Sequence, residues 1–244
     1  MADFDASVDR PMISAFGQFQ ARDCWWRRGS GEKPPKSAIQ SSAKQLALNS
    51  CWFAGFPRVI DAKILTDSKI ELDRTILTFV NGAGETGTVG GKSLSGYALR
   101  LEFPNWSVDK ATLRIDRCLF VHANAIVLAG TNRAPAISMT SNRTVFVSER
   151  LFSFDTGFAA KGMRPKWTGT HDMYRNGLEF WPSDEKRPGS SNLESWRKMV
   201  SETNAVEREV PLPQEITDTW KPRDLVPGIE VEGQCGPFSD SRDR

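Results

Sequence analysis

The sequence predicts a mainly β protein with accessory helices (α+β), built as an antiparallel β-sandwich or jelly roll with an N-terminal helical arm. The first observation is a series of short segments, rich in β-branched and aromatic residues and separated by Gly, Asn, Asp or Pro. These segments are Lys69–Leu72, Ile76–Val80, Tyr97–Phe103, Ala111–Ile115, Ala125–Leu128 and Arg143–Ser148. The second is that Leu99, Leu101 and Phe103 alternate with Arg100 and Glu102, a pattern typical of an antiparallel strand with one solvated face. Because no helical pattern separates the segments, a sandwich or jelly roll is favoured.

Residues 1–28 are expected to form the helical arm. Asp9 is placed to cap a helix with Pro11 in its first turn. Apolar residues then follow at helical spacing, namely Met12, Ile13, Phe16 and Phe19. A terminal amphipathic helix of this kind either docks on its own core or reaches a neighbouring subunit, and the sequence leaves both open.

The sandwich core is expected to occupy residues 29–210, with two further helices. One is placed near 37–50, where alanines and leucines supply an apolar side, and the other near 191–203, where the segment SNLE matches a capping box. Residues 211–244 contain repeated prolines and predict an extended tail. No internal repeat is evident from the sequence.

Composition excludes several classes of function. The net charge of +2 does not favour binding to nucleic acids or membranes. The N-terminus lacks a secretory signal pattern and no apolar run is long enough to span a bilayer, so an intracellular protein is expected. The cysteines Cys24, Cys51, Cys118 and Cys235 form no C-x-x-C pair, which predicts no metal site and leaves disulfide formation open.

A glycine-rich stretch imitates two nucleotide-binding motifs. Gly82, Gly84 and Gly87 match G-x-G-x-x-G, and Gly90–Ser93 resembles the end of a Walker loop. Both motifs require a helix directly afterwards, whereas a strand pattern follows here. The stretch is therefore interpreted as a long hairpin connection, in which Lys92 and the backbone amides retain a weak potential to bind phosphate.

Neither histidine predicts an enzyme. His122 lies in an apolar strand context, and His171 with Asp172 lies in a loop without a nucleophile-elbow motif. No catalytic, cofactor-binding or metal-binding residues are assigned. The segment 22–28 interleaves arginines with Trp25 and Trp26, as single-strand binders do, so a β-rich RNA-binding subunit of a ribonucleoprotein is the alternative function.

A family resemblance suggests a different role. An MAD start, an Asn81-Gly82 loop, an ALRLEF strand and an SVDKATLRI strand resemble cypovirus polyhedrin, over some forty residues. The chain departs from that family in having only two tyrosines.

The resemblance implies a structural protein without enzymatic activity that self-assembles into the crystalline occlusion body encasing virus particles in the host-cell cytoplasm. It also implies a jelly roll, homotrimers within a lattice, no required cofactor, and a nucleotide as a structural ligand. Such crystals would be stable at neutral pH and dissolve in alkali. Deprotonating the 12 lysines would change the net charge from +2 to about −10.

Overall fold

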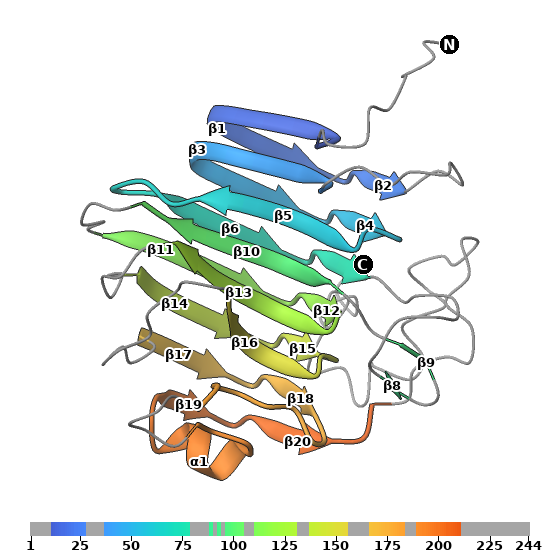
Figure 1. The fold of residues 1–244 in the computed structure, drawn as a ribbon, viewed down its shortest axis with the longest axis vertical. Coiled ribbons are helices and arrows are strands. Elements are labelled where there is room, and N and C mark those ends of the chain that lie inside the picture. The colour runs from blue at the N-terminus through green and yellow to red at the C-terminus, as the bar shows by residue number, and fades with distance from the viewer. Residues whose placement is uncertain are drawn as a thin grey trace, which may run out of the picture.

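The computed structural model describes residues 11–27, 37–78, 88–89, 92–93, 96–104, 110–130, 137–155, 166–183 and 189–210. Within these residues the chain winds as a parallel β-solenoid, in which each strand pairs in parallel with the equivalent strand one coil further on (Figure 1). A separate short pair, β8 (Thr88–Val89) with β9 (Lys92–Ser93), is antiparallel.

Strands of successive coils stack on one another and form three faces. The first face contains β5 (Arg58–Lys63), β10 (Tyr97–Phe103), β13 (Asn124–Gly130) and β16 (Arg150–Phe154). The second contains β6 (Lys69–Asp73), β11 (Ala111–Asp116), β14 (Ile137–Asn142), β17 (Lys166–Thr170) and β19 (Ser201–Thr203). The third contains β2 (Trp25–Arg27), β4 (Trp52–Ala54), β7 (Ile76–Thr78), β12 (Leu119–Val121), β15 (Val145–Phe146), β18 (Met173–Arg175) and β20 (Val206–Arg208). At the N-terminal end, β1 (Ile13–Arg22) and β3 (Ile39–Asn49) run across the corner between the first two faces and join them into one sheet.

The antiparallel jelly roll is wrong, although most of the expected strands exist. β6, β7, β10, β11 and β13 all lie within or around segments predicted as strands. The error arose because a solenoid strand also has one buried and one solvated face. Leu99 and Leu101 point inward while Arg100 and Glu102 point outward, so the alternation marks exposure and says nothing about strand direction.

A single turn type repeats between the second and third faces. In each coil it places one residue at positive φ, between 47° and 56°, at Asp23, Ser50, Arg74, Arg117, Arg143, His171 and Asn204. The backbone N–H of this residue donates to a carbonyl of the next coil at 2.8–3.0 Å, from Asp23 through His171. Because the turn stays in register, polar side chains stack along its outer ridge. Asn49 donates to Asp73 at 2.9 Å and Asn142 donates to Asp116 at 2.7 Å.

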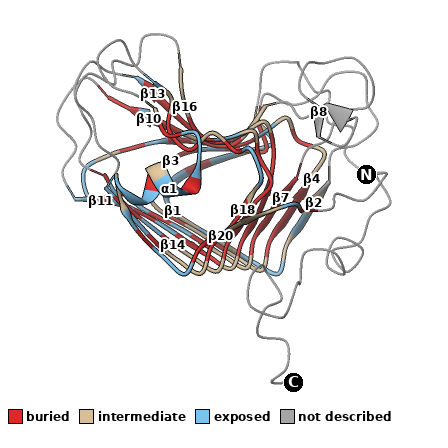
Figure 2. Cartoon of the chain, turned by 90° about the horizontal axis from the view of Figure 1, so that it is seen from below, coloured by how far each residue is buried: buried red, intermediate tan, exposed pale blue. Residues whose placement is uncertain are grey.

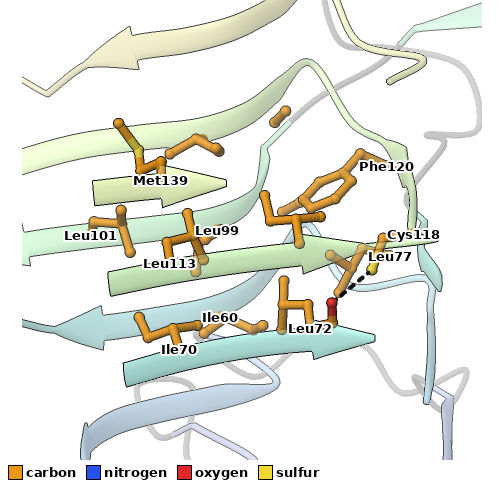
Figure 3. Packing of buried hydrophobic residues seen from close by; sticks show 14 of the residues in the cluster. Ile60, Ile70, Leu72, Leu77, Leu99, Leu101, Leu113, Cys118, Phe120 and Met139 are labelled. Carbon is orange, nitrogen blue, oxygen red and sulfur yellow. Dashed lines mark hydrogen bonds between the residues drawn. The ribbon is translucent and has the colours of Figure 1, made fainter. Parts of the chain in front are cut away.

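The interior is a stack of equivalent side chains. Leucines, isoleucines and methionine from neighbouring coils lie above one another, and the Cys118 thiol donates to the Leu72 carbonyl at 3.4 Å (Figure 3). On the third face, Phe120 stacks on Phe146 and Phe146 on Tyr174, with ring centroids 5.1 and 5.3 Å apart. Full burial of a large apolar side chain stabilises the fold by about 1.5–3 kcal/mol, so these stacked interior side chains contribute strongly to stability.

The two expected N-terminal helices are wrong, because both segments are strands. Residues of the predicted arm form β1, and the segment near 37–50 forms β3. In β3, Leu46 and Leu48 point inward on alternate positions, a period of two that the neighbouring alanines masked. Local helix propensity is a weak preference that tertiary packing overrides.

One helix is described, and it covers the C-terminal end of the coils. α1 (Leu193–Arg197) is much shorter than the predicted 191–203, and its N-cap is Asn192, which accepts from the Ser195 N–H at 2.8 Å. Trp196 is fully buried against the core, and Figure 2 shows α1 lying across the end of the solenoid. Among the described residues, no helix has the length and apolar character needed to cross a membrane.

Candidate functional site

His122 is a core residue. It is fully buried, and its Nε2 lies 3.1 Å from the Phe56 carbonyl oxygen. Burial lowers the pKa of the imidazole to about 4, although hydrogen bonds to the backbone oppose the shift. A neutral, enclosed ring has no access to a substrate, which agrees with the packed role predicted for it.

His171 and Asp172 point to opposite sides of the backbone. His171 occupies the positive-φ position of the turn, with its Nε2 3.2 Å from the Asn204 amide nitrogen. Asp172 is the next residue and lies inside the solenoid, where it accepts from the Thr144 N–H at 2.9 Å. Burial, and then the charge of Glu202, raise the pKa of Asp172 well above its usual value. The structure therefore does not unite this pair as a catalytic dyad.

A second buried carboxyl group lies nearby, and sequence reasoning missed it. Glu202 of β19 projects inward over Gly169, where a Cβ would collide with the carboxyl oxygens. Its Oε2 accepts from the Trp167 indole and the Tyr174 hydroxyl, each at 2.9 Å. Burial raises the pKa of Glu202 despite these donors. The signal in the sequence was the glycine opposite a glutamate, and it becomes visible only once the coils are aligned.

The outer surface of the first face carries a charged network. Tyr97 donates to Asp61 at 2.6 Å, and burial followed by that carboxylate raises the pKa of the phenol. Arg100 donates to Asp155 at 2.9 Å and to Glu102 at 2.7 Å. One arginine is thus shared between two carboxylates, and Asp61 is held by a neutral phenol, so these groups satisfy one another's hydrogen bonds and leave an excess of negative charge.

The two tryptophans of the Arg/Trp segment are stacked on different sides of the third face. Trp25 and Trp26 lie on opposite faces of β2. Trp25 points outward and stacks on Trp52 at 4.8 Å, whereas Trp26 packs inward on Phe53 at 4.5 Å. The two rings therefore do not share one face, and the RNA-binding alternative stays a prediction.

Three of the four cysteines lie in the described part of the chain, whereas the glycine-rich motif does not. Cys24, Cys51 and Cys118 are free thiols within the described chain, and burial raises the pKa values of Cys51 and Cys118. Cys235 and the tail 211–244 lie outside the described residues, as does the Gly82–Gly87 motif. No cluster of three or more His, Cys, Asp or Glu side chains in the described ranges is arranged to hold a metal ion.

A groove opens on the outer surface of the second face, near its C-terminal end. Its volume is about 420 Å³. It is lined by Ser138, Met139, Thr140, Lys166, Trp167, Thr168, Lys198, Met199, Val200 and Ser201. Strands β14, β17 and β19 form its floor, and the turn after α1 forms one wall. We call this feature the C-terminal groove.

The opposite end of the solenoid is uncovered among the described residues. In the first coil, Phe16 is 75% exposed, Trp25 54% and Met12 51%. Inward-facing residues of this coil, such as Phe19 and Trp26, are only partly buried. Strand β1 pairs with β3 on one side and with no other described strand. We call this free side of β1 the N-terminal edge.

Comparison with known proteins identifies no relative: no protein family, no curated protein and no solved structure matches the chain. The jelly roll implied by the polyhedrin resemblance conflicts with the parallel solenoid. The bound nucleotide and the virus particles implied by the same resemblance stay predictions.

Proposed function

We propose that this chain is a structural, non-catalytic protein that self-associates, with two copies pairing through their N-terminal edges. The observation that carries the proposal is the composition of β1. From Ile13 to Ala21 the strand has no charged residue and no proline, although its free side is ten residues long when Arg22 is included.

Free strand edges are hazardous because their unpaired N–H and C=O groups accept any other strand. Natural proteins protect such edges with lysines, prolines or a covering element. Within Ile13–Ala21, β1 has no lysine and no proline, no described element covers its free side, and it presents Phe16 to solvent. Its one protective feature is the β-bulge at Gly17/Gln18. An edge with so little protection is expected where a partner strand pairs with it in the native state.

The two ends of the solenoid favour a closed pair over a filament. At the C-terminal end α1 lies over the core with Trp196 buried beneath it, and the end strands there, β19 and β20, have only three residues each, so the described residues offer a much shorter edge for head-to-tail stacking than β1 does. Pairing two N-terminal edges about a two-fold axis satisfies both edges at once and leaves no open end. A dimer of this kind replaces the trimer that the family resemblance implied. The net charge of +2 imposes little repulsion between copies.

The test introduces a charge into the edge. Phe16→Lys places a lysine on the outward side of the edge strand, which is one of the devices by which natural proteins keep a free edge unpaired. We expect light scattering coupled to size-exclusion chromatography to give a dimer for the native chain and a monomer for Phe16→Lys. Thr112→Lys, an exposed substitution on the second face, is the matched control and should remain dimeric. A native chain that is monomeric at micromolar concentration would refute the proposal, as would a Phe16→Lys variant that stays dimeric.

A further inference from the structure

The C-terminal groove has a chemistry that the proposed self-association does not use. Its floor consists of outward side chains from adjacent coils. Ser138 and Thr140 of β14 lie beside Lys166 and Thr168 of β17, which are their register partners, and Ser201 of β19 follows Thr168. Neighbouring strands are about 4.8 Å apart, so the hydroxyl groups form a regular array of donors and acceptors.

Two lysines give the groove a positive character. Lys166 is exposed and has no ion-pair partner within the described part of the chain. Lys198 pairs with Glu194 at 2.9 Å, an exposed contact between residues four apart on α1. Such exposed surface pairs contribute little to stability, so an anionic ligand can compete for the ammonium group. None of the residues that line the groove is acidic.

The apolar part of the lining is small. Met199 and Val200 come from the turn after α1 and form the wall, while Trp167 contributes at the floor with its side chain buried. The groove therefore presents hydroxyls and ammonium groups beside a limited apolar surface, and it presents no exposed aromatic face.

We propose that the C-terminal groove binds an anionic glycan, a saccharide chain that bears carboxylate or sulfate groups. The hydroxyl array matches the many donors and acceptors of a sugar, and the two lysines match its acidic groups as point charges. A nucleic acid fits less well, because single-strand binding relies on exposed aromatic rings and arginines, which the groove lacks. The register of the parallel strands would let neighbouring sugar residues meet equivalent side chains.

The experiment measures binding of the full chain to three polymers at physiological salt: polygalacturonate and dextran sulfate as carboxylated and sulfated probes, and neutral dextran. We expect one or both anionic glycans to bind and dextran not to bind. Lys166→Ala and Lys198→Ala should each weaken binding about tenfold, as expected for loss of a hydrogen bond to a charged group. Lys69→Ala is the matched control, since Lys69 lies in the same outward column of the second face, three coils away, and outside the groove.

The results distinguish carboxylated from sulfated glycans, and they distinguish both from other classes of ligand. Preference for polygalacturonate over dextran sulfate identifies carboxylates as the recognised groups, and the reverse preference identifies sulfates. The proposal is overturned if neither anionic glycan binds, if single-stranded RNA of equal charge binds as tightly, or if Lys69→Ala weakens binding as much as Lys166→Ala. Thermal unfolding of each variant confirms that the fold is intact. Lys166→Ala removes an exposed side chain that has no ion-pair partner among the described residues, so it keeps the test decisive even if Lys198→Ala disturbs α1.

Discussion

The two carboxyl groups enclosed by the last coils predict how stability depends on pH. Asp172 and Glu202 are both buried, and burial raises the pKa of each above its ordinary value. The perturbation is the double variant Asp172→Asn and Glu202→Gln, which keeps the shape of both side chains and removes their ionisation. The oxygen that accepts from Trp167 and Tyr174 is retained in glutamine.

The sign follows from linkage between proton binding and folding. A carboxyl group with a raised pKa holds its proton more tightly in the folded state than in the unfolded chain. Its contribution is therefore fully present below the unfolded pKa, near 4, and is lost as the pH rises through the folded pKa. Each unit by which the folded pKa is raised corresponds to about 1.4 kcal/mol of stability lost on ionisation. The native protein should become progressively less stable as the pH rises above about 4, relative to the double variant.

The assay is urea unfolding of both proteins at several pH values, with the free energy of unfolding compared at each. His122 also contributes to the dependence. Its pKa is lowered to about 4, so folding loses stability as the pH falls below the unfolded histidine pKa of about 6.5. This contribution is the same in both proteins and cancels in the difference. The control is Glu194→Gln, an exposed acid whose pKa is lowered by Lys198, which should leave the pH dependence above pH 5 unchanged.

The result that would refute this reasoning is a constant difference in stability between the native protein and the double variant across the pH range. It would mean that the two carboxyl groups ionise in the folded state as readily as in the unfolded chain. A slope of opposite sign would mean that their hydrogen bonds outweigh burial, with the folded pKa values lowered instead of raised.

Two further predictions concern the cap and the repeated turn. Trp196→Ala should destabilise the protein by about 3–5 kcal/mol in urea unfolding. The reason is that the ring is fully buried, with its centroid 5.6 Å from that of Phe180 and 5.9 Å from that of Phe152. A loss of stability below about 1 kcal/mol would show that α1 does not seal the core. Ser50→Gly should raise stability by up to about 1 kcal/mol, because a non-glycine residue at φ 53° costs about 1–2 kcal/mol. A melting temperature lowered by Ser50→Gly would contradict the strain assigned to this turn.

Much of the strand content could be predicted from the sequence, whereas the direction of the strands could not. Alternation at Tyr97–Phe103 identifies β10 correctly. The same alternation is produced by an antiparallel sandwich strand and by a parallel solenoid strand with one wet face. Pairing direction depends on which segment lies one coil away, and that information is carried by the repeat.

The repeat is present in the sequence but is degenerate. Aligned on the turn, the segments read ARDCWW, LNSCWF, LDRTIL, IDRCLF, SNRTVF, GTHDMY and ETNAVE, beginning at residues 21, 48, 72, 115, 141, 169 and 202. What recurs is a class of residue at each position: a polar residue, then the positive-φ residue, a small interior residue and two strand residues. The spacing is irregular because segments of different length leave the coil between strands, so a search for a fixed period does not find it.

The candidate sites depend on this alignment still more strongly. Lys166 and Lys198 are more than thirty residues apart in the chain, and they line one groove because α1 folds back over the last coils. Glu202 meets Trp167 and Tyr174 in the same way. The predicted pair His171 and Asp172 was adjacent in sequence, yet a turn between two faces sends such neighbours in opposite directions.

The association state of the native chain at neutral pH tests the proposed function most directly. Sedimentation velocity over a series of micromolar concentrations would measure the association state in free solution, without a chromatography column. Pairing through β1 predicts one dimeric species that Phe16→Lys converts to a monomer of unchanged secondary structure. A single monomeric species at every concentration would contradict the proposal, since it would show that the uncharged edge of β1 remains unpaired by a second copy.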